Sequence, residues 1–200
     1  TAYHSALERR PDFVSIHLKT GRILARQGKF EQAEMSLRES VKANPHDPVV
    51  HREMAHLLTQ RQRFDEAILE YRETLRLAPN MVAACVSLGN LLAMLGRPAE
   101  AVPYLENALT YDPRNVAALE NLMLVLAQTG QLDRAIQYGK EAVTLKPNSF
   151  EIRFNLGLML IQIQRYEDGI AQVREAGRIR PDDPRCLEQI QRLESILENP

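Results

Sequence analysis

The 200-residue chain has no tryptophan, two cysteines and almost no net charge, with 25 Lys and Arg against 26 Asp and Glu. This balance gives no reason to expect nucleic acid as a partner, because nucleic-acid binding usually needs a strongly basic face. The sequence also lacks an apolar run of about 20 residues, so we expect no segment that inserts directly into a membrane. Apolar residues still make up 44% of the chain, enough for a substantial core.

Motifs that carry catalytic chemistry are missing as well. The sequence contains no glycine-rich phosphate loop, no HExxH, no CxxC and no nucleophile elbow. Zinc needs three or four converging ligands, yet His51 and His56 lie five residues apart, off the i, i+4 face of a helix. We interpret the histidines as packed or half-exposed side chains. The sequence therefore predicts no enzyme activity, no metal site and no cofactor.

Prolines recur along the chain at a fixed spacing of 34 residues. A period of this length is typical of repeat architectures, in which each repeat is a small unit stacked on its neighbours. The prolines in register are Pro11, Pro45, Pro79, Pro113, Pro147 and Pro181. This spacing favours a binding scaffold over a compact domain with an active site.

Other residue types keep the same period. Small residues stand 12 positions before five of these prolines, and leucine stands 21 positions before them. Small residues suit places where two helices approach closely, and large apolar residues fill the space between. The pattern resembles the tetratricopeptide repeat, which has small residues at positions 8, 20 and 27, large ones at 7, 11 and 24, and proline at 32. The two sets are Ala33, Ala67, Ala101, Ala135 and Gly169, and Leu24, Leu58, Leu92, Leu126 and Leu160.

The resemblance implies an all-α fold, a right-handed α-α superhelix or solenoid of stacked antiparallel helical hairpins. Residues 1–200 are then a single tetratricopeptide solenoid. Its full repeats are 14–47, 48–81, 82–115, 116–149 and 150–183. Residues 1–13 match the second half of a repeat, so the chain looks like a fragment of something longer. Residues 184–200 are expected to form a capping helix with one apolar stripe: Cys186, Leu187, Ile190, Leu193 and Leu197.

Two expectations concern the core. Cys85 and Cys186 lie about three repeats apart, too far for a disulfide, so we expect both to be small core residues. Met123 takes a slot that is Gly or Ala in the other four repeats, while Gly139 takes one usually filled by a large residue. We expect Met123 to be buried beside Gly139 and to fill the space there.

The resemblance places peptide binding in the concave groove, lined by positions 2, 5, 6, 9, 12 and 13 of each first helix. This face is basic at its amino-terminal end, amide-bearing in the middle and apolar at its carboxy-terminal end, where we expect Phe154 and Leu158 to be exposed. Two other interpretations stay open: the 184–197 helix covers the apolar cluster, and the arginines are only a solvated face. The candidate binding residues are Lys19, Arg22, Arg26, Arg52, His56, Asn90, Asn121, Leu124, Phe154, Asn155 and Leu158.

The expected function is that of a protein–protein interaction scaffold, which binds an extended or helical protein segment in the groove. The basic end favours an acidic segment. The alternative is the substrate-recruiting arm of a larger enzyme such as a glycosyltransferase, which the start of the chain inside a repeat leaves open. Asn121 and Asn155 match two rungs of the asparagine ladder of such enzymes, but Glu53 and Lys19 break the series. No three consecutive repeats match the carboxylate clamp of chaperone-tail binders.

The amino-terminal end carries one more expectation. Residues 1–10 resemble a second helix without its first helix, so part of their apolar face lacks a natural cover. We expect weak self-association through residues 1–30, because repeats bury their core only through neighbours. Reduced core cysteines favour a cytoplasmic location, while a targeting segment upstream stays open.

Overall fold

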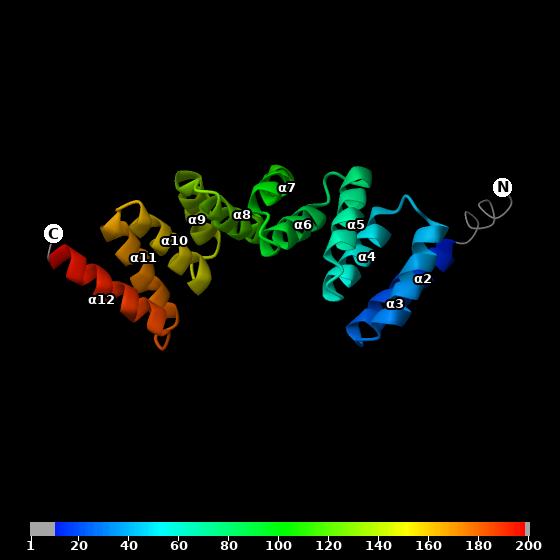
Figure 1. Ribbon diagram of the computed structural model, residues 1–200, viewed down its shortest axis with the longest axis horizontal. Helices are drawn as coiled ribbons and strands as arrows, with labels where there is room; N and C mark the ends of the chain where they lie inside the picture. Colours follow the sequence, from blue (N-terminus) through cyan, green and yellow to red (C-terminus); the bar gives the residue numbers. More distant parts are fainter. Residues whose placement is uncertain (1–10, 199–200) are drawn as a thin grey trace. The chain divides into compact units, whose positions relative to one another are not determined.

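The computed structural model describes residues 11–198 and the side chains of residues 14–192. Every element in this part is an α-helix, and consecutive helices are joined by short turns (Figure 1). The helices are α2 (Pro11–Arg26), α3 (Phe30–Ala43), α4 (Pro48–Gln60), α5 (Phe64–Leu77), α6 (Val82–Met94), α7 (Pro98–Tyr111), α8 (Val116–Gln128), α9 (Leu132–Leu145), α10 (Phe150–Gln162), α11 (Tyr166–Ile179) and α12 (Pro184–Glu198). The all-α fold of stacked helical hairpins is thus confirmed.

The described chain divides into two compact units, which meet in sequence between Leu91 and Leu92, inside α6. In the first unit α2 packs on α3 and α4 packs on α5, and α4 also contacts both helices of the preceding pair. In the second unit each helix from α7 to α12 packs on the next one. These neighbour-to-neighbour contacts are those of a repeat array.

The turn inside each helix pair contains one residue with a left-handed backbone. At Gly28, Gly96 and Gly130 the φ angles are 75°, 72° and 78°, a conformation that glycine adopts without steric cost. Gln62 and Gln164 occupy the same place in the other two pairs, with φ angles of 59° and 63°. Because these five residues follow one another at 34-residue intervals, the backbone keeps the period even where the residue type changes.

Small residues let paired helices approach closely. A Cβ atom added to Gly157 in α10 would lie 2.7 Å from Val173 Cγ2 and 3.0 Å from the carbonyl oxygen of Gly169 in α11. Contacts this short do not occur between real Cβ atoms and their neighbours, so a side chain at Gly157 would push the two helices apart.

The pair α8–α9 reaches the same packing with its residue sizes exchanged. Met123 is fully buried, and a Cβ atom added to Gly139 would lie 2.8 Å from Met123 Sδ and 3.1 Å from Leu156 Cδ1. The long Met123 side chain thus occupies the space that Gly139 leaves. The expected compensation between these two residues is confirmed.

Helix α12 caps the second unit with part of its expected stripe. Cys186 is buried and Ile190 packs against the same apolar cluster, but Leu187 is 59% exposed, so its assignment to the covered stripe is wrong. Leu187 follows Cys186 directly, so its side chain is rotated by about 100° around the helix axis from that of Cys186. The side chains of Leu193 and Leu197 lie outside the described residues. Cys85 and Cys186 are buried and form no disulfide.

Candidate functional site

The basic end of the expected groove lies on α2 and α4, the first helices of two neighbouring pairs. Arg22, Arg26, Arg52 and His56 line one pocket with a volume of about 340 Å³. Its other lining residues are Gly21, Ala25, Leu37, Glu53, Leu57 and Gln60. Lys19 stands on α2 as an exposed side chain outside the lining. The structure therefore brings most of the predicted basic residues together.

Two of these arginines are not free cations. Glu53 Oε1 accepts hydrogen bonds from Arg22 Nη2 at 2.8 Å and from Arg52 Nη2 at 2.7 Å. Burial alone would raise the pKa of Glu53, but the two guanidinium groups hold it below its ordinary value. Arg22 and Arg52 are partly exposed and both bind a carboxylate from the same face.

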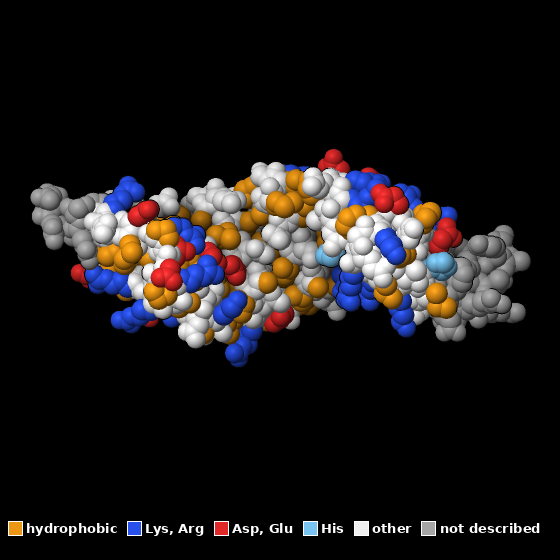
Figure 2. All heavy atoms as spheres, turned by 90° about the horizontal axis from the view of Figure 1, so that it is seen from below, with side chains coloured by type: hydrophobic (Ala, Val, Ile, Leu, Met, Phe, Trp, Pro, Cys, Tyr) orange, Lys and Arg blue, Asp and Glu red, His pale blue; other side chains and the backbone are white. Residues whose placement is uncertain are grey.

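Two further basic side chains of the expected groove keep their charge exposed. On the face drawn in Figure 2, Lys and Arg side chains stand on both units, with Asp and Glu side chains among them. Lys19 and Arg26 are exposed, and within the described part of the chain neither forms an ion pair or a side-chain hydrogen bond. Positive charge is thus left over after Glu53 has bound its two partners.

The middle of the expected groove is partly accessible. Asn90 on α6 is exposed, whereas Asn121 and Leu124 on α8 are half-buried. Asn155 and Leu158 on α10 are half-buried too, and α10 contacts α8. The two asparagines and the two leucines therefore occupy the same places on two neighbouring first helices.

The carboxy-terminal apolar patch is largely closed. Phe154 is 6% exposed and clusters with Phe150, Val173, Ala176 and Cys186, and Leu158 packs against this cluster. The Phe150 and Phe154 rings stack with centroids 5.6 Å apart, and the Arg185 guanidinium lies 4.9 Å and 5.0 Å from them. The expectation that Phe154 is exposed is wrong, because α12 and its Arg185 cover the ring.

Sequence comparison assigns the chain to a family. Two sequence models described as tetratricopeptide repeat match it, one over residues 86–150 and the other over residues 24–88 and 126–190. The chain belongs to the tetratricopeptide repeat family. Membership supports a general role as a protein-interaction scaffold. Among curated proteins no sequence matches the chain.

Solved tetratricopeptide structures share the fold at low sequence identity. YrrB, described as a tetratricopeptide protein with an unusual peptide-binding site, is 19% identical with a TM-score of 0.81, covering 96% of this chain and 98% of its own. MamA from Desulfovibrio magneticus is 22% identical with a TM-score of 0.78, covering 86% and 98%. PilF of Pseudomonas aeruginosa is 22% identical with a TM-score of 0.78, covering 95% and 86%.

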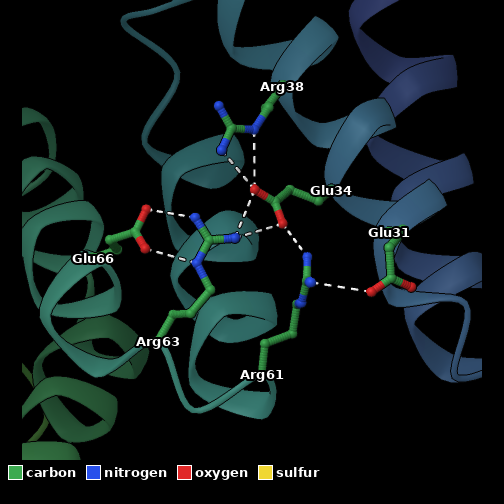
Figure 3. Close-up of polar contacts among 6 residues, drawn as sticks. All are labelled: Glu31, Glu34, Arg38, Arg61, Arg63 and Glu66. Carbon is green, nitrogen blue, oxygen red and sulfur yellow. Dashed lines mark hydrogen bonds and ion pairs between the residues drawn. The ribbon is translucent and has the colours of Figure 1, made fainter.

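A separate charge network links α3 of the first repeat to the α4–α5 turn and the start of α5 in the second repeat (Figure 3). Its members are Glu31, Glu34, Arg38, Arg61, Arg63 and Glu66. Glu34 is 7% exposed and accepts hydrogen bonds from Arg38, Arg61 and Arg63, with Arg63 Nη1 2.8 Å and 2.7 Å from its two oxygens. Burial would raise the pKa of Glu34, but Arg38 and Arg63 lower it.

The same junction contains a buried histidine. His51 is 7% exposed, with Nδ1 2.6 Å from Glu70 Oε2 and Nε2 2.9 Å from the carbonyl oxygen of Pro45. Both neighbours accept hydrogen bonds, so the geometry favours the imidazolium form, which alone has two donors. The hydrogen bond with Glu70 raises the pKa of His51 against the opposite effect of burial. The expectation that the histidines are packed or half-exposed holds for His51 and His17, while His56 is exposed.

Sequence reasoning missed the partners in both charge clusters. Arg22 and Glu53 are 31 residues apart, and Glu34 and Arg63 are 29 apart. Both separations are close to the 34-residue period, so aligning the sequences of neighbouring repeats would have suggested each pair. Elsewhere among residues 14–192, no three His, Cys, Asp or Glu side chains gather as a metal ion would require. No helix of the described part is long and apolar enough to cross a membrane.

Proposed function

We propose that the protein is a non-enzymatic scaffold whose first-helix face binds a segment of another protein, and that the pocket on α2 and α4 receives an acidic part of that segment. The observation that carries this proposal is the convergence of Arg22, Arg26, Arg52 and His56 on one pocket. Arginine matches carboxylates with paired, directional hydrogen bonds. The peptide-binding site named for YrrB, a protein of the same fold, supports a peptide as the class of ligand.

The test uses the two cations that fold stability does not need. Lys19→Glu and Arg26→Glu reverse exposed charges without breaking an ion pair of the described part. A fluorescein-labelled peptide with four consecutive aspartates should bind the native chain, and the double variant should bind about tenfold more weakly, as two exposed contacts of up to ~1 kcal/mol each would give. Fluorescence anisotropy measures both affinities.

Salt and a matched variant complete the test. Binding should weaken as salt rises from 50 to 500 mM, because screening shortens the reach of exposed charges to less than ~10 Å. Lys140→Glu/Lys146→Glu makes the same change of net charge at two exposed lysines, on the second helix α9 and at its C-cap, and should leave affinity unchanged. Equal losses in this control and in Lys19→Glu/Arg26→Glu would show that net charge alone binds the peptide.

We also propose that the amino-terminal end supports weak self-association. Ile16 and Ile23 on α2 are 58% and 55% exposed, whereas the residues at the same places in the next repeat, Val50 and Leu57, are buried. Residues 1–10, the other part of this expectation, lie outside the described residues. Sedimentation over a concentration series should show weak association that Ile16→Asp abolishes. A monomer at all concentrations contradicts it.

A further inference from the structure

One acidic side chain stands inside the basic pocket. Glu53 on α4 accepts hydrogen bonds through the same oxygen, Oε1, from Arg22 on α2 and from Arg52 on its own helix. The Glu53 side chain is 17% exposed, so water screens these contacts only in part. The carboxylate thus occupies donors that a bound carboxylate would need.

The pocket therefore has cations of two kinds. Arg22 and Arg52 are already engaged by Glu53, while Arg26 and the neighbouring Lys19 have no ion-pair partner among the described residues. A ligand with one carboxylate gains little by replacing Glu53, because one carboxylate–arginine contact is exchanged for another. Binding beside Glu53 places two negative charges close together, which is unfavourable.

We propose that Glu53 determines the specificity of the pocket by disfavouring segments with a single carboxylate and thereby selecting segments with several adjacent carboxylates. Such a segment reaches Arg26 and Lys19 with some of its charges and shares Arg22 and Arg52 with Glu53. A built-in group that weakens the wrong ligand is a general source of specificity. This inference rests on the proposed binding of acidic segments.

A purely structural role makes a different prediction. The contact between Glu53 and Arg22 joins α2 to α4, much as Glu34 joins the second helices of the same two repeats. If that were its whole effect, Glu53→Gln would lower the stability of the protein and leave the preference between acidic ligands as it is. The ratio of two affinities therefore separates a role in specificity from a role in folding.

The experiment compares two fluorescein-labelled Gly-Ser peptides, one with a single aspartate and one with four consecutive aspartates. The native full chain should bind the four-aspartate peptide at least about tenfold more tightly, since several charge contacts then add. In Glu53→Gln, the single-aspartate peptide should gain about tenfold and the four-aspartate peptide less than about threefold, because only the former needed the donors that Glu53 held. Glutamine keeps an acceptor for both arginines but carries no charge.

Two further variants serve as controls. Glu73→Gln makes the same change of net charge on α5, where Glu73 pairs with Arg76, and should leave both affinities unchanged. Glu53→Asp retains the charge and should retain the preference. Circular dichroism checks that each variant is folded.

An unchanged ratio in a folded Glu53→Gln, or a loss of affinity for the single-aspartate peptide, overturns the role of Glu53. Loss of the preference in Glu53→Asp also overturns it. If neither peptide binds the native chain or Glu53→Gln, the proposed function itself fails. If both peptides bind in a manner that depends on Arg26 while the ratio stays the same in Glu53→Gln, only the inference about Glu53 fails.

Discussion

At the scale of single residues, the molecule departs from its repeat pattern without losing its packing. Met123 and Gly139 exchange the sizes that the other repeats give to these two places, and the Met123 sulfur lies where a Cβ atom of residue 139 would intrude. The two residues fit only as a pair. Met123 would clash with the large residue that other repeats carry in place of Gly139, and Gly139 would leave a gap beside the small residue that they carry in place of Met123.

The first prediction concerns this pair. Met123→Ala should lower the free energy of unfolding by about 2–4 kcal/mol, because it leaves a cavity in a fully packed site. Gly139→Leu alone should also destabilise, by about 1–3 kcal/mol or more, through overpacking. Combined, the two changes should cost much less than their sum, since leucine fills the space that methionine vacates. Urea unfolding measures all three variants, and strict additivity would contradict the interpretation.

His51 carries the second prediction, a dependence of stability on pH. Its pKa is raised in the folded protein by Glu70, helped by the Pro45 carbonyl and the nearby charge of Glu73. The stabilisation is therefore fully present below about pH 6.5, the value of an unperturbed histidine, and is lost as pH rises through the folded pKa. Thermal unfolding between pH 5.5 and 9 should show this loss in the native chain and a flatter profile in His51→Gln. Parallel profiles of the two proteins would exclude His51 as the cause.

At the scale of helices, the junction between the first two repeats differs from the rest in being strongly ionic. Glu34 on α3 binds Arg61 and Arg63, which flank the turn between α4 and α5, and Glu53 on α4 binds Arg22 on α2. In the described part of the second unit, Arg134 pairs with Glu106 and Arg185 lies 3.8 Å from Glu151 of α10, and all four side chains are more than a third exposed. Salt should therefore act mainly on the first junction.

The third prediction tests that junction. Glu34→Gln should lower the free energy of unfolding by about 1–3 kcal/mol, because it leaves arginines without their buried counter-charge; the partial exposure of those arginines reduces the effect. Glu106→Gln, the matched change at an exposed pair, should cost less than about 1 kcal/mol. In hydrogen exchange, 1 M salt should speed exchange in α2 and α3 more than in α8 to α11. A uniform effect of salt along the chain would count against an ionic junction.

The helices themselves were largely predictable from the sequence. The second helix of the third repeat, Pro98–Tyr111, has bounds that the sequence marks, because Pro98 suits a first turn and Asp112-Pro113 cannot continue a helix. The convergence of Arg22, Arg26 and Arg52 also followed from their places in the repeat. The contact of Glu53 with Arg22 did not, since it depends on a side chain that crosses from a neighbouring helix. The burial of Phe154 matches the alternative that the 184–197 helix covers the apolar cluster, and the sequence could not decide between cover and exposure.

At the scale of the whole molecule, the chain is a series of local contacts, so its stability should not be uniform. The two cysteines can report on local differences in stability. Cys85 lies in α6, and Cys186 lies in α12, which packs on α11. Both are buried, and burial raises the pKa of the Cys186 thiol, which further suppresses its reactive thiolate.

The fourth prediction follows from these positions. Neither cysteine should react quickly with a thiol reagent in the native chain. As urea is added, Cys186 should become reactive at a lower concentration than Cys85, because opening α12 breaks its contacts with α10 and α11 and leaves the other helix pairs packed. Mass spectrometry of chains alkylated across a urea series gives both transitions. Simultaneous labelling of the two cysteines would indicate a single cooperative transition instead.

The Met123–Gly139 pair also bears on how such a chain can be recombined. Because the repeats share one length and one backbone, a helix of one repeat could in principle replace the corresponding helix of another. Helices α8 and α9, however, are matched to each other through Met123 and Gly139. Transplanting α8 alone would bring a methionine against a helix that already carries a large residue, and transplanting α9 alone would bring a glycine to a place with nothing to fill it. The part that can be moved between repeats is therefore the whole hairpin, and a chimera cut at the α8–α9 turn should fail where one cut between hairpins folds.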